Sequence, residues 1–207
     1  MTLETDCIRG MKIVLASNSP RRKELLTAME MDFEVRTQDG IDESYPDGLE
    51  MAEIPEYISR QKAAAYSLDD GELLISADTI VYLDGEVLGK PAGAEEACEM
   101  LEKLSGRTHQ VVTGVTIRTR ERIHTFSCVT DVTFAVLTKE QIQHYVTKYK
   151  PFDKAGAYGI QEWIGCVGVT GIHGSYYNVM GLPVQRLSKE LASFLGENCM
   201  HTEDRIC

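Results

Sequence analysis

Two long stretches rich in β-branched residues constrain the fold of this 207-residue chain more than any other feature. Residues 108–119 and 123–136 flank a short charged turn, so they predict an antiparallel pair of strands. Residues 73–83 predict another long strand, and Asp84-Gly85 predicts a hairpin whose second strand is Glu86–Leu88. A sheet that contains such hairpins is at least partly antiparallel.

Helical segments alternate with strands along the chain. Ser19 and Pro20 suit the N-cap and first position of a helix, Thr138 with Gln141 resembles a capping box, and Pro55 and Pro183 suit helix starts. The other expected elements are strands at 12–16, 33–37 and 166–172, helices at 56–68, 94–104 and from 138 to near 151, and a loop at 38–52. The alternation predicts an α/β fold with a mixed sheet.

Charge and composition exclude several function classes. The net charge of −11 disfavours a nucleic-acid partner, because such a surface repels phosphate backbones. The acidic first ten residues do not form a signal peptide, and no stretch of 18 apolar residues predicts a membrane span. The six cysteines follow no disulfide or zinc spacing, so we expect free thiols in the cytoplasm; Cys199, His201 and Cys207 lie in a polar tail.

The segment SNSPRR at residues 17–22 is the first candidate site. A strand that turns into a helix presents free backbone N–H groups and the positive end of the helix dipole. Arg21 and Arg22 fall in the first turn of that helix, where they would complete an anion site that includes Ser17. The alternative is a capped helix with two solvated arginines, which the six residues alone favour. However, a pair of cations opposes the dipole there and requires an explanation.

Asp78 is the second candidate, because it interrupts the apolar strand LLISADTIVYL. An ionised carboxylate in such a strand is costly unless it is paired or binds a metal. The alternative is an Asp that accepts backbone hydrogen bonds at a kink, and the sequence does not decide between the two. Strand alternation places Asp78 and Thr79 on opposite faces, so a shared site predicts that the strand bulges or ends there.

Other polar residues are weaker candidates. Lys62 lies within a predicted helix, Lys90 lies in the turn GKP, and Asp42 with Glu43 forms an acidic loop pair. Such residues are usually solvated, and the acidic pair becomes a metal site only if its loop folds toward Asp78. Gly-rich segments at 153–161 and 174–183 permit close approach of the backbone to a ligand, although tight turns are the simpler explanation.

Five motifs, taken together and in order, resemble the Maf family of nucleotide pyrophosphatases. They are LASNSPRRKELL at 15–26, SADTIVYLDGEVLGKP at 76–91, LSGRTHQVVTGV at 104–115, DKAGAYGIQ at 153–161 and GSYYNVMGLP at 174–183. The resemblance implies one domain over residues 12–195, between an unmatched extension at 1–11 and a polar tail at 196–207. It also implies an elongated mixed sheet flanked by helices, two lobes with a central cleft as in inosine triphosphatase, and a homodimer.

The resemblance also implies a reaction: hydrolysis of a nucleoside triphosphate to the monophosphate and pyrophosphate, dependent on Mg²⁺ or Mn²⁺. It implies that Asp78 accepts a proton, that Arg22, Lys62 and Lys90 handle phosphate, and that Asp42 and Glu43 bind the metal with Asp78. A final set matches positions that separate substrate classes, and it resembles the branch that acts on dTTP and UTP rather than 7-methyl-GTP: Arg21, Thr79 and Gln161.

One departure and two rival functions accompany this resemblance. Glu162 and Trp163 follow Gln161, where the family usually has Gly, and this predicts a change at the rim of the pocket. The first rival function is a pyrophosphatase for 7-methyl-GTP or another non-standard nucleotide. The second is a non-enzymatic nucleotide-binding regulator of cell division, which would bind triphosphates without releasing pyrophosphate. The set of basic and acidic residues argues against it, because binding alone does not need Asp78 as a base.

Overall fold

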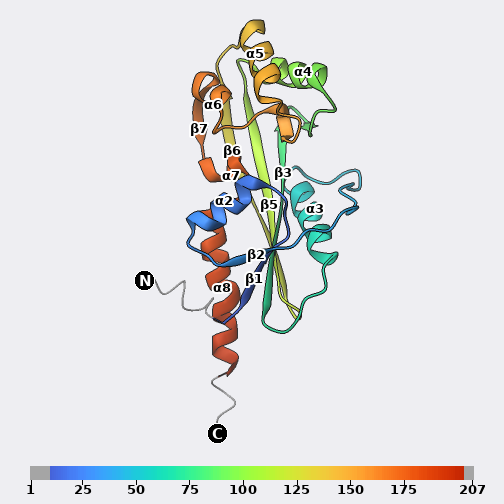
Figure 1. The fold of residues 1–207 in the computed structure, drawn as a ribbon, viewed down its shortest axis with the longest axis vertical. Helices are drawn as coiled ribbons and strands as arrows, with labels where there is room; N and C mark the ends of the chain where they lie inside the picture. Colours follow the sequence, from blue (N-terminus) through green and yellow to red (C-terminus); the bar gives the residue numbers. More distant parts are fainter. Residues whose placement is uncertain (1–9, 203–207) are drawn as a thin grey trace.

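Three long strands determine the shape of the molecule. The computed structural model describes residues 10–202, with side chains described as far as Gly196. The strands β3 (Glu72–Leu83), β5 (Thr108–Arg118) and β6 (Ile123–Phe134) run along the long axis of an elongated molecule (Figure 1). The turn at Asp84-Gly85 leads into β4 (Glu86–Leu88), which pairs antiparallel with β3. Both predicted hairpins are therefore confirmed.

The sheet is mixed, as the sequence predicts. It has seven strands in the order β2-β1-β3-β5-β6-β7, with β4 added to β3. The short strands β1 (Lys12–Leu15) and β2 (Phe33–Val35) pair parallel with each other, and β1 pairs parallel with β3. The remaining pairs, including that of β6 with the edge strand β7 (Val169–His173), are antiparallel.

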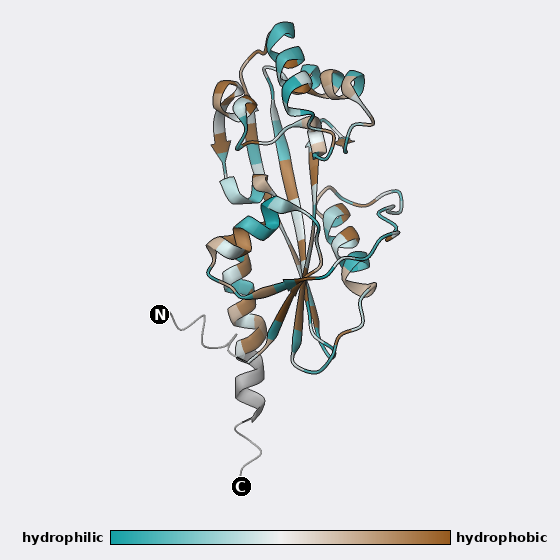
Figure 2. Ribbon diagram, viewed as in Figure 1, coloured by the Kyte–Doolittle hydropathy of each residue, from teal (hydrophilic) through white to brown (hydrophobic). Residues whose placement is uncertain are grey.

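Helices cover both faces of the sheet. The helix α3 (Glu53–Ala64) packs on one face of β3 and β5, and its face carries a small apolar cluster that includes Ile54, Ile58 and Ile80. The helices α2 (Pro20–Ala28), α7 (Tyr176–Met180) and α8 (Val184–Thr202) lie across the other face (Figure 1). The large core lies on that face, where the apolar side chains of the strands are concentrated, and hydrophobic segments run along the strands (Figure 2).

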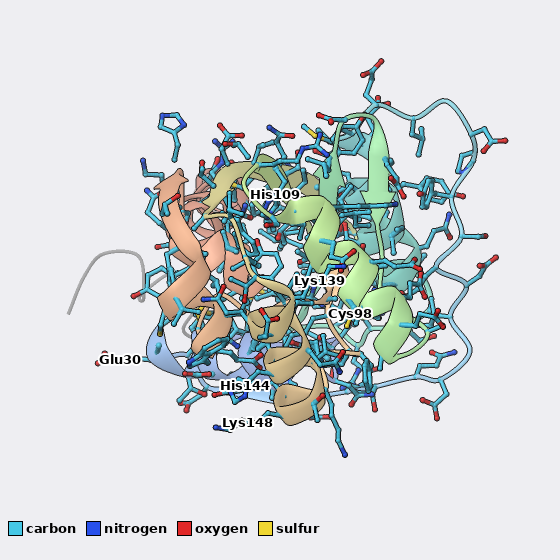
Figure 3. All side chains as sticks on the ribbon, turned by 90° about the horizontal axis from the view of Figure 1, so that it is seen from above. Glu30, Cys98, His109, Lys139, His144 and Lys148 are labelled. Atoms are coloured by element: carbon cyan, nitrogen blue, oxygen red, sulfur yellow. The ribbon has the colours of Figure 1, made fainter. Side chains whose placement is uncertain are left out.

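The far end of the long strands carries a second group of helices. These are α4 (Ala94–Leu104), α5 (Lys139–Tyr149), the 3₁₀ turn η1 (Ala155–Ala157) and α6 (Trp163–Gly168). Figure 3 shows α4 and α5 side by side over this end of the sheet, with Cys98 on α4 and His144 on α5. The ring of His109 is buried beneath them against Phe134 and Tyr158, and burial lowers the pKa of His109 to about 4.

Several boundaries differ from the sequence prediction. Helix α3 begins at Glu53 and ends at Ala64, so Pro55 lies within its first turn, where a missing N–H is tolerated. The predicted strand at 166–172 is wrong in its first part, because Cys166 belongs to α6 and β7 begins at Val169. Helix α8 continues to Thr202, past the start of the predicted polar tail. The side chains of Cys199, His201 and Cys207 lie outside the described residues.

Gly114 allows α3 to lie close against the sheet. It pairs with Asp78 across the β3–β5 ladder, so both residues face α3. A Cβ atom at this position would lie 2.3 Å from the carbonyl carbon of Pro55 and 2.4 Å from the nitrogen of Glu56. The first turn of α3 therefore packs directly on the backbone of β5. This contact sets the height of the whole helix above the face that carries Asp78.

Ion pairs of Glu72 with Lys12 and Arg36 link the start of β3 to β1 and to the residue that follows β2. The carboxylate of Glu72 accepts hydrogen bonds from Arg36 at 2.7 and 3.1 Å and from the backbone N–H of Asp69 at 3.1 Å, and its side chain is only 6% exposed. The hydrogen bonds from Arg36 and Asp69 lower the pKa of Glu72 to about 2. The ionised carboxylate thus stabilises the folded state.

Glu72→Gln should lower the free energy of unfolding near pH 7 by about 1–3 kcal/mol, because it removes charged hydrogen bonds. The folded-state pKa is depressed, so this stabilisation is present above the unfolded value of about 4.5 and is lost as pH falls toward about 2. Urea unfolding of both proteins between pH 7 and pH 2.5 checks this. A difference that stays constant over that range would contradict the role given to the ionised carboxylate.

Candidate active site in a gap of the sheet

A gap in the sheet places Asp78 and Thr79 in one pocket. Strand β1 pairs with β3 only as far as Ile75, and β4 pairs with β3 only from Val81 onward. Between these points, no strand of the described residues pairs with that side of β3, and a pocket of about 550 Å³ opens there. Asp78 and Thr79 face opposite sides of the sheet, yet both line this pocket.

The prediction that β3 must bulge or end at this point is wrong. Its pairing with β5 continues without a shift through Asp78 opposite Gly114 and Thr79 opposite Thr113. The interruption lies in the neighbouring strands instead. Because β1 and β4 leave the edge of β3 uncovered, a ligand in the gap can contact side chains from both faces of the strand.

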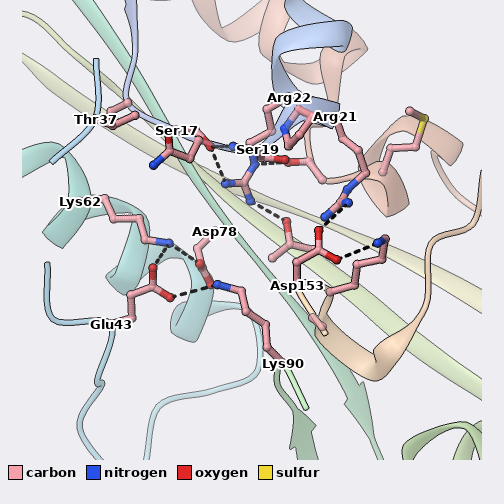
Figure 4. Close-up of a pocket in the computed structure, with 18 of the residues that line it drawn as sticks. Ser17, Ser19, Arg21, Arg22, Thr37, Glu43, Lys62, Asp78, Lys90 and Asp153 are labelled. Atoms are coloured by element: carbon pink, nitrogen blue, oxygen red, sulfur yellow. Dashed lines mark hydrogen bonds and ion pairs between the residues drawn. The ribbon is translucent and has the colours of Figure 1, made fainter. Parts of the chain in front are cut away.

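Glu43, Lys62, Asp78 and Lys90 form a group that we name the Asp78 cluster (Figure 4). The ammonium of Lys62 lies 2.7 Å from Asp78 and 3.0 Å from Glu43, and the side chains of Lys62 and Asp78 are each only 13% exposed. Lys90 is more exposed and lies 3.8 Å from Glu43. Burial raises the pKa of Glu43, but Lys62 and Lys90 outweigh this effect, so its pKa lies below the usual value.

The start of α2 forms the opposite wall of the pocket. Pro20 occupies the first turn as predicted, whereas the side chain of the N-cap residue Ser19 makes no capping hydrogen bond. Instead, the hydroxyl of Ser17 accepts the backbone N–H of Ser19 at 3.2 Å. The other N–H groups of the first turn have no partner within the helix, so they remain available to a bound anion.

Arg22 is a cation without a matching anion. Its guanidinium donates to the carbonyl of Gly181 at 2.9 Å, to Thr79 at 3.1 Å and to Ser17 at 3.3 Å, all of which are neutral acceptors (Figure 4). No ion pair of Arg22 with a carboxylate occurs among the described residues. Burial lowers the pKa of Arg22, although the nearby charge of Asp78 opposes this. A partly buried guanidinium with neutral partners is a strong site for phosphate.

The segment Asp153–Gln161 closes the third side of the pocket, and we name its lining residues the Gly-rich wall. They are Asp153, Lys154, Ala155, Tyr158, Gly159 and Gln161. Arg21 of α2 donates to the carboxylate of Asp153 at 3.3 Å and so bridges two sides of the pocket (Figure 4). Gln161 is exposed at the end of this wall.

The predicted metal ligands are only partly brought together. Asp78 and Glu43 share Lys62, but Asp42 does not line the pocket, and its carboxylate accepts the backbone N–H of Ser44 at 2.8 Å. No group of three or more His, Cys, Asp or Glu side chains suited to a metal occurs in the described part of the chain. Two carboxylates nevertheless fit Mg²⁺, which binds through one or two protein carboxylates together with water and substrate phosphates.

Some pocket residues were missed by the sequence analysis. Asp153 and Lys154 lie within a quoted motif but were not predicted as site residues, and their side chains form ion pairs along the pocket. Tyr158 also lines the pocket, and Tyr66 does so from beyond the end of α3. The signal that could have identified Lys154 is a lysine inside a Gly-rich apolar segment, where burial requires a counter-charge.

The chain is similar over most of its length to known proteins of one family. The family model described as Maf-like protein matches residues 12–194. A protein of Bacteroides thetaiotaomicron named dTTP/UTP pyrophosphatase is 60% identical over 182 residues, which cover 87% of this chain and 94% of that protein. Proteins with the same name from Parabacteroides distasonis (57%, covering 90% and 98%) and Flavobacterium psychrophilum (48%, covering 85% and 91%) are also similar.

A solved structure of a HAM1 protein from Coxiella burnetii is more distantly similar. It has a TM-score of 0.48 and 16% sequence identity, and the match covers 88% of this chain and 99% of that chain. At this level of similarity it carries no argument about the site. The family match spans nearly the whole described chain, and the relatives match over almost their full length. This chain therefore belongs to the family of Maf-like proteins.

Proposed function

We propose that this protein hydrolyses dTTP and UTP to the nucleoside monophosphate and pyrophosphate, the activity for which its relatives from Bacteroides thetaiotaomicron and Parabacteroides distasonis are named. The observation that carries the proposal is the position of Arg22. Within the described part of the chain, its guanidinium hydrogen-bonds only neutral partners, and it lies across the sheet gap from Asp78. A polyphosphate chain supplies the missing negative charge and lies beside a carboxylate that can accept a proton.

The Asp78 cluster suits attack of water on the α-phosphorus. A water oxygen forms the new bond to phosphorus, the bond from phosphorus to the bridging oxygen breaks, and pyrophosphate leaves. Asp78 accepts the proton of the water, while Lys62 at 2.7 Å holds the carboxylate in place. Arg22 and Lys90 stabilise the charge that develops on the phosphate oxygens. Substrate phosphates also compete for Lys62, which would free Glu43.

We further propose that Asp78 and Glu43 hold a divalent cation, Mg²⁺ or Mn²⁺, together with the substrate phosphates. Such an ion lowers the pKa of bound water and neutralises phosphate charge. Asp42 stays a predicted ligand from the sequence, but its position outside the pocket makes Glu43 the better candidate. Asp78 and Glu43 contact the same ammonium, so both carboxylates already face one point in space.

The nucleoside then lies along the Gly-rich wall. With the phosphates between α2 and the Asp78 cluster, the remaining part of the pocket is bounded by Arg21, Thr79 and the wall residues. A Gln amide offers a donor and an acceptor to a base edge, and Gln161 stands at the open end. Thr79 acts on the nucleoside less directly than Gln161, because its hydroxyl is hydrogen-bonded to Arg22 at 3.1 Å and to Thr113 at 3.0 Å.

The decisive experiment measures pyrophosphate release from a panel of triphosphates, with Mg²⁺, with Mn²⁺ and with a chelator. We expect metal-dependent release from dTTP and UTP at rates at least about tenfold above those for CTP, ATP, GTP and 7-methyl-GTP. Preference for 7-methyl-GTP would contradict dTTP and UTP as the substrates and would make 7-methyl-GTP the substrate instead. Tight binding of dTTP without any release would instead support a regulatory nucleotide-binding protein and reject the enzymatic proposal.

Location and assembly complete the proposal. Free thiols at Cys98, Cys128 and Cys166 support a cytoplasmic protein. No helix in the described range is both long and apolar enough to cross a bilayer. A homodimer is supported by exposed apolar side chains near the edge strand β7, namely Ile172, Tyr176 and Tyr177. Sedimentation equilibrium tests this, because a monomer mass at micromolar concentration contradicts it.

A further inference from the structure

A chain of polar contacts links Lys154 of the Gly-rich wall to residues behind the wall. The carboxylate of Glu162 accepts a hydrogen bond from the hydroxyl of Tyr145 on α5 and lies 3.2 Å from the ammonium of Lys154. Neither Glu162 nor Trp163 lines the pocket, and Trp163 packs against His144 instead. The departure after Gln161 therefore acts behind the wall rather than at the rim that the sequence predicts.

Lys154 depends on this carboxylate for its charge balance. Its side chain is only 9% exposed, and its ammonium contacts two anions, Asp153 at 2.7 Å and Glu162 at 3.2 Å. An ammonium so nearly buried is costly unless it is paired. Asp153 is itself well exposed, so Glu162 is the more shielded of the two partners. Loss of the charge on Glu162 would leave Lys154 with a single, solvated counter-ion.

Besides Lys154 itself, the chain of contacts reaches the pocket at two points. The first is Asp153, which joins Lys154 at 2.7 Å to Arg21 at 3.3 Å. The second is Gly159, whose backbone N–H donates to the hydroxyl of Tyr145 at 3.0 Å. A Cβ atom on Gly159 would lie only 3.0 Å from the carboxyl carbon of Glu162 and 3.1 Å from Lys154. Gly159 of the wall therefore packs directly against the side chains of Lys154 and Glu162.

The backbone of the wall needs such support. Gly156 and Ala157 both adopt left-handed conformations, with φ of 64° and 56°. This conformation is unfavourable for alanine, so contacts elsewhere must stabilise it. The backbone N–H of Gly156 donates to the carbonyl of Gly89 at 3.0 Å, and a Cβ atom on Gly156 would lie 2.9 Å from the side chain of Val81. The contacts of Tyr145, Glu162 and Lys154 support the same segment at Gly159.

We propose that Glu162 is a positioning residue for the nucleoside part of the pocket. It neutralises Lys154, and through Asp153 and Gly159 it fixes Arg21 and the Gly-rich wall in the arrangement that receives the nucleoside. The inference rests on the proposed function for the identity of the ligand. It concerns only the wall, because neither Glu162 nor Tyr145 contacts Arg22 or the Asp78 cluster.

The phosphate part of the pocket should be insensitive to Glu162, and this separates positioning from a general charge effect. If the charge of Glu162 acted through space, the protein without that negative charge would bind every anion more strongly. Removal of a support for the wall would instead weaken binding only of ligands that contact the wall. A nucleotide and pyrophosphate therefore distinguish the two effects, because only the nucleotide reaches that side.

The test compares Glu162→Gln, which keeps an acceptor for Tyr145 but removes the charge, with Glu140→Gln as a matched control. Glu140 is exposed on α5 and outside the pocket. Calorimetry in Mg²⁺ measures two dissociation constants, one for the non-hydrolysable α,β-imido analogue of dUTP and one for pyrophosphate. For Glu162→Gln we expect the first to rise about tenfold and the second to change less than twofold. Glu162→Asp, which keeps the charge, should recover most of the affinity.

Each outcome decides the proposal. Equal changes in both constants would show a general charge effect, and no change in either would show a structural role only; both results overturn it. If Glu162→Gln unfolds, Tyr145→Phe supplies the same comparison at smaller amplitude, because it removes the hydroxyl that bonds both Glu162 and Gly159. Calorimetry does not require turnover, so failure of the unchanged protein to release pyrophosphate would reject the proposed function and leave this inference separately testable.

Discussion

Asp78→Asn should reduce turnover of dTTP by at least ~10²-fold, the scale expected when a general base is lost. The amide has nearly the same size as the carboxylate, so β3 and its pairing with Gly114 should remain. It cannot accept the proton of the attacking water, and it cannot balance the charge of Lys62, which lies 2.7 Å away. We therefore expect kcat to fall much more than KM changes. Steady-state pyrophosphate release and thermal unfolding of the same preparation measure both effects.

Asp70→Asn is the matched control for this result. It makes the same chemical change at an exposed aspartate that pairs with Arg120, outside the pocket. Its turnover should equal that of the unchanged protein within twofold. Near-normal turnover of Asp78→Asn would remove Asp78 from the proposed chemistry. Loss of activity together with a collapsed melting temperature would assign it a structural role.

Gly114→Ala should destabilise the fold by about 3 kcal/mol, a large effect for one methyl group. The new Cβ would lie 2.3–2.4 Å from backbone atoms of Pro55 and Glu56, which cannot move without the rest of α3. A shift of α3 would also carry Lys62 away from Asp78. We therefore expect urea unfolding to show reduced stability and the folded fraction to show reduced turnover.

Gly196→Ala is the control for Gly114→Ala, because the same substitution should not destabilise the fold at this position. Apart from its chain neighbours and the backbone of its own helix, no described atom lies within 4 Å of a Cβ built at Gly196, which belongs to helix α8. Alanine favours a helix by up to about 1 kcal/mol over glycine, so this variant should be neutral or slightly more stable. If Gly114→Ala were equally well tolerated, the direct packing of α3 on the backbone of β5 would be contradicted.

The sequence predicted local features that depend on few residues. The hairpin at Asp84-Gly85, the capping box of Thr138 with Gln141 and Pro20 in the first turn of α2 are confirmed, because each depends on local backbone conformation. The predicted bounds of helix α3 were wrong, because proline is tolerated throughout the first turn and Pro55 therefore does not mark the first residue. Cys166 was misassigned because short apolar runs with glycine fit a strand or a helix equally well.

The site was harder to predict because it depends on contacts distant in the chain. Alternation along β3 correctly separates Asp78 from Thr79, but the gap that reunites them arises where β1 and β4 stop pairing. The pairing of Lys154 with Glu162 likewise requires the turn between them to bring their side chains together. Periodicity within a strand or helix contains no information about these distances.

The uncovered edge of β3 has a consequence for how such a pocket can vary. The carbonyl of Ile75 accepts the N–H of Ala16, so the backbone groups of Thr79, four residues later, point to the same side and into the gap. Part of the pocket is therefore main chain, whose donors and acceptors persist through almost any substitution. Mutation can change the selectivity of this pocket only through the side chains around a polar strip that the fold itself supplies.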